Sequence, residues 1–161
     1  MTLTLSRRAF LLASAAAALV LRPWRAEAAV APMTEHPFAR ANYLPDAPPR
    51  AKTGTGKVIR GQVVTAGAGE PVPHAQVEYY LNTTPDVGGI GEQNPANRGQ
   101  VVADAQGRFS FETDPPQRVQ RGAAPHTHTR ATAPGHQEFY YRHLTPSEPS
   151  VDEVVIVLVR T

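Results

Sequence analysis

The fold of this chain is decided in the stretch Arg98-Gly-Gln-Val-Val-Ala-Asp-Ala-Gln-Gly-Arg-Phe-Ser-Phe-Glu112. Its middle, from Asp104 to Gly107, has the composition of a tight turn. After the turn, Phe109 and Phe111 recur at the two-residue period of a strand, which places both rings on one face. The stretch therefore predicts a β-hairpin with the two phenylalanines facing a core.

Short runs in which apolar and polar residues alternate also lie on both sides of this stretch, and no segment has a helical period. In the run before it, alternation places Ala75, Val77, Tyr79 and Leu81 on one face and Gln76, Glu78 and Tyr80 on the other. The 16 prolines and 12 glycines favour many turns between short strands. We therefore expect one all-β sandwich over residues 57–161. Further strands are predicted at 58–64, at His126 and His128, at 137–143 and at 154–159. The last has no polar alternation, so we expect it in the middle of the sandwich, covered on both faces.

The N-terminal segment is predicted to be an export signal. Ser6-Arg-Arg-Ala-Phe-Leu11 fits the twin-arginine consensus, residues 12–21 are apolar, and Ala26-Glu-Ala28 is a small-x-small cleavage site. The apolar run is shorter than the roughly 20 residues of a membrane span, so we expect no stable span. We expect cleavage after Ala28, which gives a signal peptide over residues 1–28 and a periplasmic or extracellular protein.

Residues 29–56 are rich in proline and have no apolar period. They indicate either an extended arm that wraps the domain, anchored by Phe38 and Tyr43, or a disordered linker. An arm of this kind could also cross to a second copy of the chain and form a homodimer.

Removal of the signal changes the charge balance. Of the 16 basic and 14 acidic residues, residues 1–28 hold four arginines and one glutamate, so 12 basic and 13 acidic residues remain, a formal charge of −1. No basic stripe is left, which argues against nucleic acid as a partner. The chain has no cysteine, which excludes disulfides and thiolate metal ligands.

Two histidines two positions apart precede a turn signal in Pro125-His-Thr-His128. In a strand their side chains share one face, with roots roughly 6.5 Å apart at about 3.3 Å per residue. One cation could lie between the two imidazoles. Such a pair also occurs at surfaces and core edges, so the residues alone leave both interpretations open.

Taken in order, the motifs resemble the catalytic domain of the intradiol ring-cleavage dioxygenases. The resemblance covers most of residues 32–136, and the closing strand also fits. It implies a β-sandwich of the intradiol dioxygenase or prealbumin type, and a non-haem ferric ion, Fe(III), that binds a catechol for ring cleavage by oxygen. The matching pieces are Thr34-Glu-His-Pro-Phe38, Gly61-x-Val63, Pro71-Val-x-x-Ala-x-Val-Glu78, Asn97-Arg-Gly-x-Val-x-x-Asp-Ala-x-Gly-Arg-Phe-x-Phe111, Pro125-His-x-His128 and Ala133-Pro-Gly-His136.

The resemblance implies iron ligands that this chain supplies only in part. Two histidines of the family correspond to His126 and His128, whereas the two ligand tyrosines have no counterpart. The chain has Asp86-Val-Gly-Gly-Ile-Gly91 and Pro116-Gln-Arg-Val119 at the expected places, and Tyr80 replaces the family's strand tryptophan. Phenolates hold iron in the ferric state, while imidazole suits several metals, so another divalent metal is the alternative to Fe(III).

Two imidazoles alone are fewer than the three or four protein ligands of typical metal sites. Candidates to complete the site are Glu78 or Tyr80, if their face looks toward the histidines, and Tyr140 or Tyr141 from the following strand. Tyrosines at such positions also serve as core or rim aromatics. Arg98 could neutralise an anionic substrate or form a surface ion pair.

Two functions follow from these residues. The first is an exported, metal-dependent dioxygenase of intradiol type that acts on a small catechol-like aromatic. The second is a non-enzymatic exported β-sandwich that keeps the fold, has lost the ferric site and serves as a binding module. A tyrosine hydroxyl or a carboxylate within about 4 Å of the gap between the two imidazoles would favour the enzyme.

Overall fold

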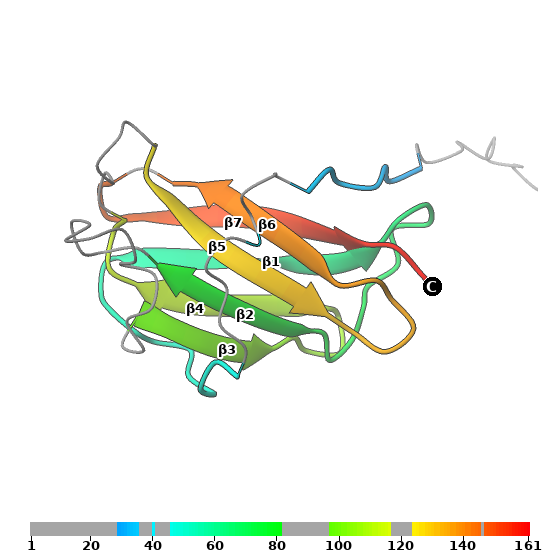
Figure 1. Cartoon of the computed structure of the whole chain (residues 1–161), viewed down its shortest axis with the longest axis horizontal. Helices are drawn as coiled ribbons and strands as arrows, with labels where there is room; N and C mark the ends of the chain where they lie inside the picture. The colour runs from blue at the N-terminus through cyan, green and yellow to red at the C-terminus, as the bar shows by residue number, and fades with distance from the viewer. Residues whose placement is uncertain (1–28, 36–39, 41–45, 82–96, 117–123, 146) are drawn as a thin grey trace, which may run out of the picture.

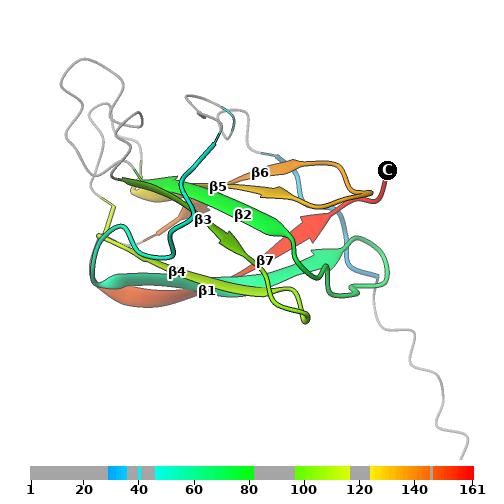
Figure 2. The ribbon, with the colours of Figure 1, turned by 90° about the horizontal axis from the view of Figure 1, so that it is seen from below.

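The computed structural model describes residues 29–35, 40, 46–81, 97–116, 124–145 and 147–161. Within them the chain forms two stacked β-sheets and no helix, which confirms the all-β sandwich. Figure 2 shows the two layers from the side. No helix among the described residues is long and apolar enough to cross a membrane. The three-stranded sheet has the order β4 (Arg108–Thr113), β1 (Lys57–Thr65), β7 (Ser150–Leu158), and the four-stranded sheet the order β3 (Arg98–Val102), β2 (Gln76–Leu81), β5 (His126–Thr132), β6 (Phe139–Leu144) (Figure 1).

The pairing of the strands depends on close backbone approach in the three-stranded sheet. β1 is antiparallel to β4 and parallel to β7, whereas all neighbours in the four-stranded sheet are antiparallel. Gly61 lies in the middle of β1, opposite Val154 of β7. A Cβ at Gly61 would lie 2.1 Å from the carbonyl oxygen of Val154, so only glycine allows this approach.

The predicted hairpin over residues 98–112 is wrong in its pairing. The turn itself forms, with the Asp104 amide donating to the Arg108 carbonyl at 2.9 Å and the Gly107 amide to the Asp104 carbonyl at 3.0 Å. However, β3 pairs with β2 and β4 pairs with β1, so the turn carries the chain from one sheet to the other. Phe109 and Phe111 do face the core. Alternation determines which face of a strand is buried but not which strand becomes its neighbour.

The closing strand is also placed differently from the prediction. β7 lies at an edge of its sheet, with β1 as its neighbour, and Val155 on its outer face is 54% exposed. Only its last part is covered on both faces: Ile156 and Leu158 lie in the core, while Val157 lines a small cavity with Met33 of the arm. A run of apolar residues can thus arise at a sheet edge that another segment of the chain covers.

The described parts of residues 29–56 lie against the sandwich and bond to it through their backbone. Near its start, Val30 and Gly67 exchange backbone hydrogen bonds of 2.9 and 2.7 Å. Further on, the Pro48 carbonyl accepts from the Gln100 amide of β3 at 3.0 Å, and the Ala51 carbonyl accepts from the Glu112 amide of β4 at 2.8 Å. This segment therefore joins the edges of the two sheets. Phe38 and Tyr43, the predicted anchors, lie outside the described residues.

One side chain fixes this segment from within the core. The Tyr79 hydroxyl donates to the carbonyl of Arg50 at 3.0 Å, and its ring stacks on Phe111 with centroids 3.9 Å apart. Gly99 leaves the space for this bond, since a Cβ there would lie 2.5 Å from both the hydroxyl and the carbonyl oxygen. Burial raises the pKa of Tyr79, which keeps the hydroxyl protonated as a donor.

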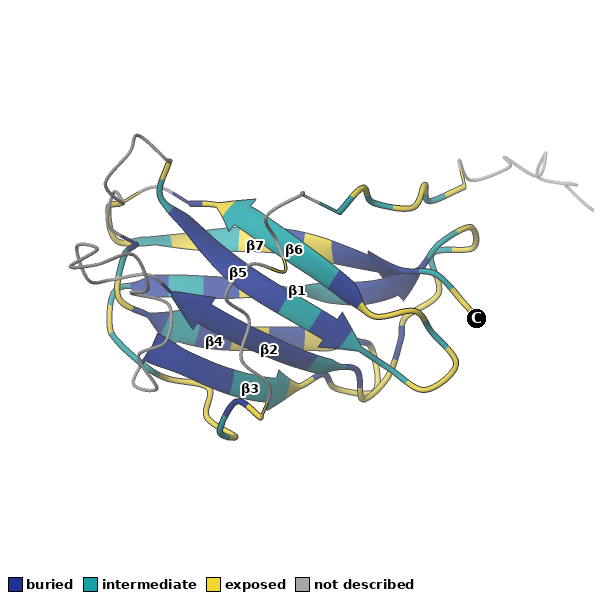
Figure 3. Ribbon diagram, in the orientation of Figure 1, coloured by how far each residue is buried: buried dark blue, intermediate teal, exposed yellow. Residues whose placement is uncertain are grey.

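The core lies between the sheets and becomes polar at one end. Figure 3 shows the buried residues along the strands that face each other. The apolar part includes Ile59, Val63, Val77, Phe109, Phe111, Ala131, Phe139, Ile156 and Leu158.

At the end where β1 begins, the fully buried Lys57 donates to Asp152 at 2.9 Å and to Ser150. His143 Nε2 lies 3.2 Å from the other oxygen of Asp152. Burial alone would raise the pKa of Asp152, but the hydrogen bonds from Lys57, Ser150 and His143 outweigh it and hold the pKa below its ordinary value.

Candidate functional site

The histidine pair lies on the outer face of the four-stranded sheet. β5 is an inner strand of that sheet, between β2 and β6. Ala131 belongs to the core cluster, so alternation directs His126 and His128 to the opposite face. Their ring centroids lie 4.8 Å apart, and the residues are only 8% and 3% exposed. The pair is therefore a covered polar site on the sheet, separate from the sandwich core.

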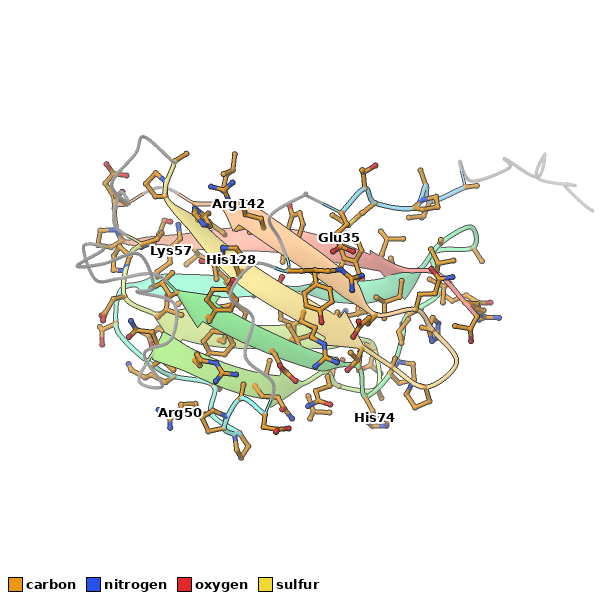
Figure 4. All side chains as sticks on the ribbon, viewed as in Figure 1. Glu35, Arg50, Lys57, His74, His128 and Arg142 are labelled. Atoms are coloured by element: carbon orange, nitrogen blue, oxygen red, sulfur yellow. The ribbon has the colours of Figure 1, made fainter. Side chains whose placement is uncertain are left out.

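The strand register arranges the surrounding side chains in two rows across the sheet. The first row, the histidine row, places Arg98 of β3 beside Tyr80 of β2, His128 of β5 and Arg142 of β6. The Tyr80 ring stacks on the His128 imidazole, with centroids 4.4 Å apart and planes 13° from parallel. Figure 4 shows His128 and Arg142 side by side on this face. The second row holds Gln100, Glu78, Arg130 and Tyr140 in the same strand order.

The contact of His126 with the backbone defines one of the two neutral tautomers of its ring. Its Nδ1 lies 2.7 Å from the backbone carbonyl oxygen of Ala124. A carbonyl only accepts, so this bond requires the proton on Nδ1 and leaves the lone pair on Nε2. Histidines that bind metals commonly have this arrangement, because the second nitrogen is fixed by a backbone carbonyl or carboxylate.

The second row does not contribute a ligand to the histidines in this structure. Glu78 is paired with Arg130 at 3.2 Å, and Arg130 also contacts Glu138 at 2.9 Å. Tyr140 lies beneath the Arg40 guanidinium, whose central carbon is 4.5 Å from the ring centroid. Burial raises the pKa of Tyr140, with Arg130 opposing, so the hydroxyl keeps its proton. Glu78 and Tyr140 thus belong to a charge network beside the histidine row.

The remaining sequence candidates divide between the two faces of the sheet. Tyr141 points inward and packs against the core, with its ring centroid 5.8 Å from that of His143, so the structure does not bring it to the histidines. Tyr80 is on the histidine face and in ring contact with His128. Arg98 is also on that face, 8% exposed, at the β3 end of the first row.

Sequence reasoning missed Arg142. Its Nη2 lies 3.1 Å from His126 Nδ1, and its strand position is directly opposite His128. The signal was present in the sequence: the antiparallel strands β5 and β6 meet at the Pro134-Gly135 turn, where Gly135 has φ +70°. A hairpin register centred on residue 135 pairs 128 with 142, and alternation then places both side chains on one face.

The described residues fit a ferric ion poorly and a divalent cation better. Among them, no three His, Cys, Asp or Glu side chains come together as a metal site. The pair supplies two neutral nitrogens, whereas the ferric state of iron is stabilised by negatively charged phenolates. A divalent cation binds imidazole nitrogens and fills its remaining coordination positions with water or ligand. Residues 86–91 and 117–119, where the tyrosines of the resembling family would stand, lie outside the described residues, and no tyrosine occurs in 82–96 or 117–123.

Solved structures show the same fold. The dioxygenase domain of a dioxygenase and carbohydrate-binding protein fusion from Streptomyces sp. SirexAA-E matches 80% of this chain and 95% of that domain, with a TM-score of 0.58 and 22% identity. Hydroxyquinol 1,2-dioxygenase from Pseudomonas putida DLL-E4 matches 83% of this chain and 67% of its own, with a TM-score of 0.59 and 15% identity. Catechol 1,2-dioxygenase from Pseudomonas arvilla C-1 matches 83% of this chain and 63% of its own, with a TM-score of 0.58 and 14% identity.

No family model matches the sequence, and no curated protein matches it. The protein is thus an all-β sandwich with a covered pair of histidines on its larger sheet. Its fold is that of the intradiol ring-cleavage dioxygenases.

Proposed function

We propose that this protein binds a divalent metal at His126 and His128 and receives a catechol-like aromatic there, as an oxidoreductase of intradiol dioxygenase type. The observation that carries the proposal is the contact between His126 Nδ1 and the Ala124 carbonyl, because the tautomer that donates to this carbonyl has its lone pair on Nε2. The neighbouring imidazole lies on the same face, 4.8 Å away between ring centroids. The fold similarity to catechol and hydroxyquinol dioxygenases supports the class of substrate.

The two histidines, Tyr80 and Arg98 have separate roles in this proposal. A bound divalent cation would act as a Lewis acid that lowers the pKa of a catechol hydroxyl. His126 and His128 would hold it, and the stacked Tyr80 ring would fix the orientation of His128. Arg98 would neutralise the charge of an anionic aromatic at the β3 end of the row. The low exposure of the histidines would limit the access of bulk water.

The test measures metal content and oxygen consumption in protein exported through its own leader. The double variant His126→Asn, His128→Asn should contain at least tenfold less metal than the wild type and should show no oxygen uptake with catechols. The control is His74→Asn: His74 is exposed, far along the molecule in Figure 4, and has φ +58°, which asparagine tolerates. If the wild-type protein neither contains nor takes up metal and consumes no oxygen with catechols, the proposal is wrong.

A second function is favoured by one contact. The Arg142 guanidinium, a permanent cation, lies 3.1 Å from His126 Nδ1, which suits a site that binds an anionic aromatic without metal. The protein would then be a non-enzymatic exported binding module. Titration of metal-free protein with 4-nitrocatechol separates the two: binding that is unaffected by a chelator supports the module, and binding that needs added metal supports the oxidoreductase.

We also propose that residues 1–28 direct export by the twin-arginine pathway to the periplasm or exterior, and that residues 29–56 contact a second copy of the chain. Replacement of Arg7 and Arg8 by lysine should keep the protein in the cytoplasm; unchanged export would refute the first proposal. Light scattering of the mature protein tests the second, which a monomeric mass would refute.

A further inference from the structure

Two groups compete for one ring nitrogen of His126. The Ala124 carbonyl lies 2.7 Å from Nδ1 and can only accept a hydrogen bond. The Arg142 Nη2 lies 3.1 Å from the same atom and can only donate. A single nitrogen cannot donate to the carbonyl and accept from the guanidinium at once. If Arg142 is the partner, the proton moves to Nε2 and that nitrogen cannot bind a cation.

The charge of Arg142 acts in the same direction as its hydrogen bond. β6 places Arg142 directly opposite His128 in the antiparallel register, so its guanidinium belongs to the histidine row. The guanidinium of an arginine is positively charged under ordinary conditions. A divalent cation held by the two imidazoles would therefore lie near a fixed like charge in a covered site, where Coulomb repulsion is poorly screened.

We propose that Arg142 makes metal binding at His126 and His128 depend on an anionic aromatic ligand. This inference rests on the proposed function. An anion in the site would attract the guanidinium away from Nδ1 through charge-assisted hydrogen bonds and offset the repulsion between the guanidinium and the cation. Nδ1 would then donate to Ala124, and Nε2 would accept the cation. Because coupling between two ligands is reciprocal, the metal also tightens the binding of the anion.

A regulatory arginine and a purely structural arginine differ in their expected effect on metal affinity when no aromatic ligand is present. A guanidinium that only packs against β5 would leave metal affinity unchanged when it is replaced. A guanidinium that opposes the cation makes the wild-type site weak for metal alone, and its replacement makes the site stronger. Arg142 would thus be a positioning and specificity residue that acts through His126.

The experiment measures Zn²⁺ binding to metal-stripped full-length mature protein by calorimetry, with and without 4-nitrocatechol, which is anionic near neutral pH. Zinc is redox-inert, so no turnover occurs. Arg142→Gln should bind Zn²⁺ alone 10 to 100 times more tightly than the wild type. 4-Nitrocatechol should tighten Zn²⁺ binding at least tenfold more in the wild type than in Arg142→Gln. The control Arg108→Gln removes the same charge from an exposed position on β4, in the other sheet, and should behave as wild type.

Equal Zn²⁺ affinity and equal coupling in Arg142→Gln and wild type would overturn the role of Arg142 and leave the metal site itself standing. Loss of histidine-dependent Zn²⁺ binding in every variant, with ligand present, would instead refute the proposed function. Circular dichroism checks folding, and Arg142→Met, which keeps the aliphatic stem, serves if Arg142→Gln does not fold. The wild type alone is also decisive, because Zn²⁺ affinity that is independent of 4-nitrocatechol would contradict the proposal.

Discussion

Replacement of the two partners of the buried ion pair should have unequal costs. Lys57 is fully buried, whereas the Asp152 side chain is 14% exposed and also accepts from Ser150 and His143. Asp152→Asn leaves the Lys57 charge in the core without a counter-charge, which costs about 3 kcal/mol, at the low end for a broken buried pair because the amide oxygen still accepts. Lys57→Met leaves Asp152 with two hydrogen bonds and partial solvation, so the cost is about 1 kcal/mol.

Urea unfolding at pH 7, followed by circular dichroism, measures both free energies of unfolding. The double variant Lys57→Met, Asp152→Asn should be more stable than Asp152→Asn alone, because it contains no buried charge. Glu153→Gln is a matched control: it removes a carboxylate from the exposed pair with Arg60 on the same strands and should change stability by less than about 0.5 kcal/mol. If Lys57→Met proves at least as destabilising as Asp152→Asn, the assignment of the buried charge to Lys57 is wrong.

Two further predictions concern the same interior. Because the folded pKa of Asp152 is lowered, its contribution to stability is complete above its unfolded pKa of about 4 and is lost as the pH falls through the folded pKa. Between about pH 2 and 5, the free energy of unfolding in urea should therefore depend less steeply on pH in Asp152→Asn than in the wild type. An equal slope in the two proteins would contradict this. Thr127 is fully buried, and its Oγ1 has no hydrogen-bond partner among the described residues, so Thr127→Val should raise the free energy of unfolding by about 1 kcal/mol. Thr129→Val loses a 3.4 Å hydrogen bond from Oγ1 to the Tyr141 carbonyl, so its free energy of unfolding should rise by less. Equal increases in the two variants would show that the missing partner of Thr127 is not the cause.

The sequence was sufficient for the fold class and for the faces of most strands, because burial enforces alternation. Phe109, Phe111, Val77 and Tyr79 all face the core as the two-residue period predicts. It was insufficient for the neighbours of the strands. The Asp104 turn forms its local hydrogen bonds although its two strands diverge to different sheets, so a turn signal in the sequence does not establish that the flanking strands pair.

The difference between the face of a strand and its neighbours also explains which residues of the candidate site could be predicted. Spacing alone placed His126 and His128 on one face, but which side chains surround them depends on the register across four strands. Glu78 and Tyr140 are one row away from the pair, Tyr141 is on the other face, and Tyr80 is beside His128. No property of an isolated strand separates these cases. The register of the β5–β6 hairpin was the one piece of cross-strand information that the sequence contained, through its turn.

β6 connects the two polar regions of the molecule. Consecutive residues of this strand face opposite ways, so Arg142 points out to His126 while His143 points in to Asp152. The hydrogen bond from His143 to Asp152 joins the edge of the four-stranded sheet to β7 of the other sheet. Each polar contact of β6 therefore constrains the other through a single backbone, because a strand cannot shift by one residue without exchanging its two faces. The buried ion pair and the position of Arg142 are for this reason parts of one structural arrangement.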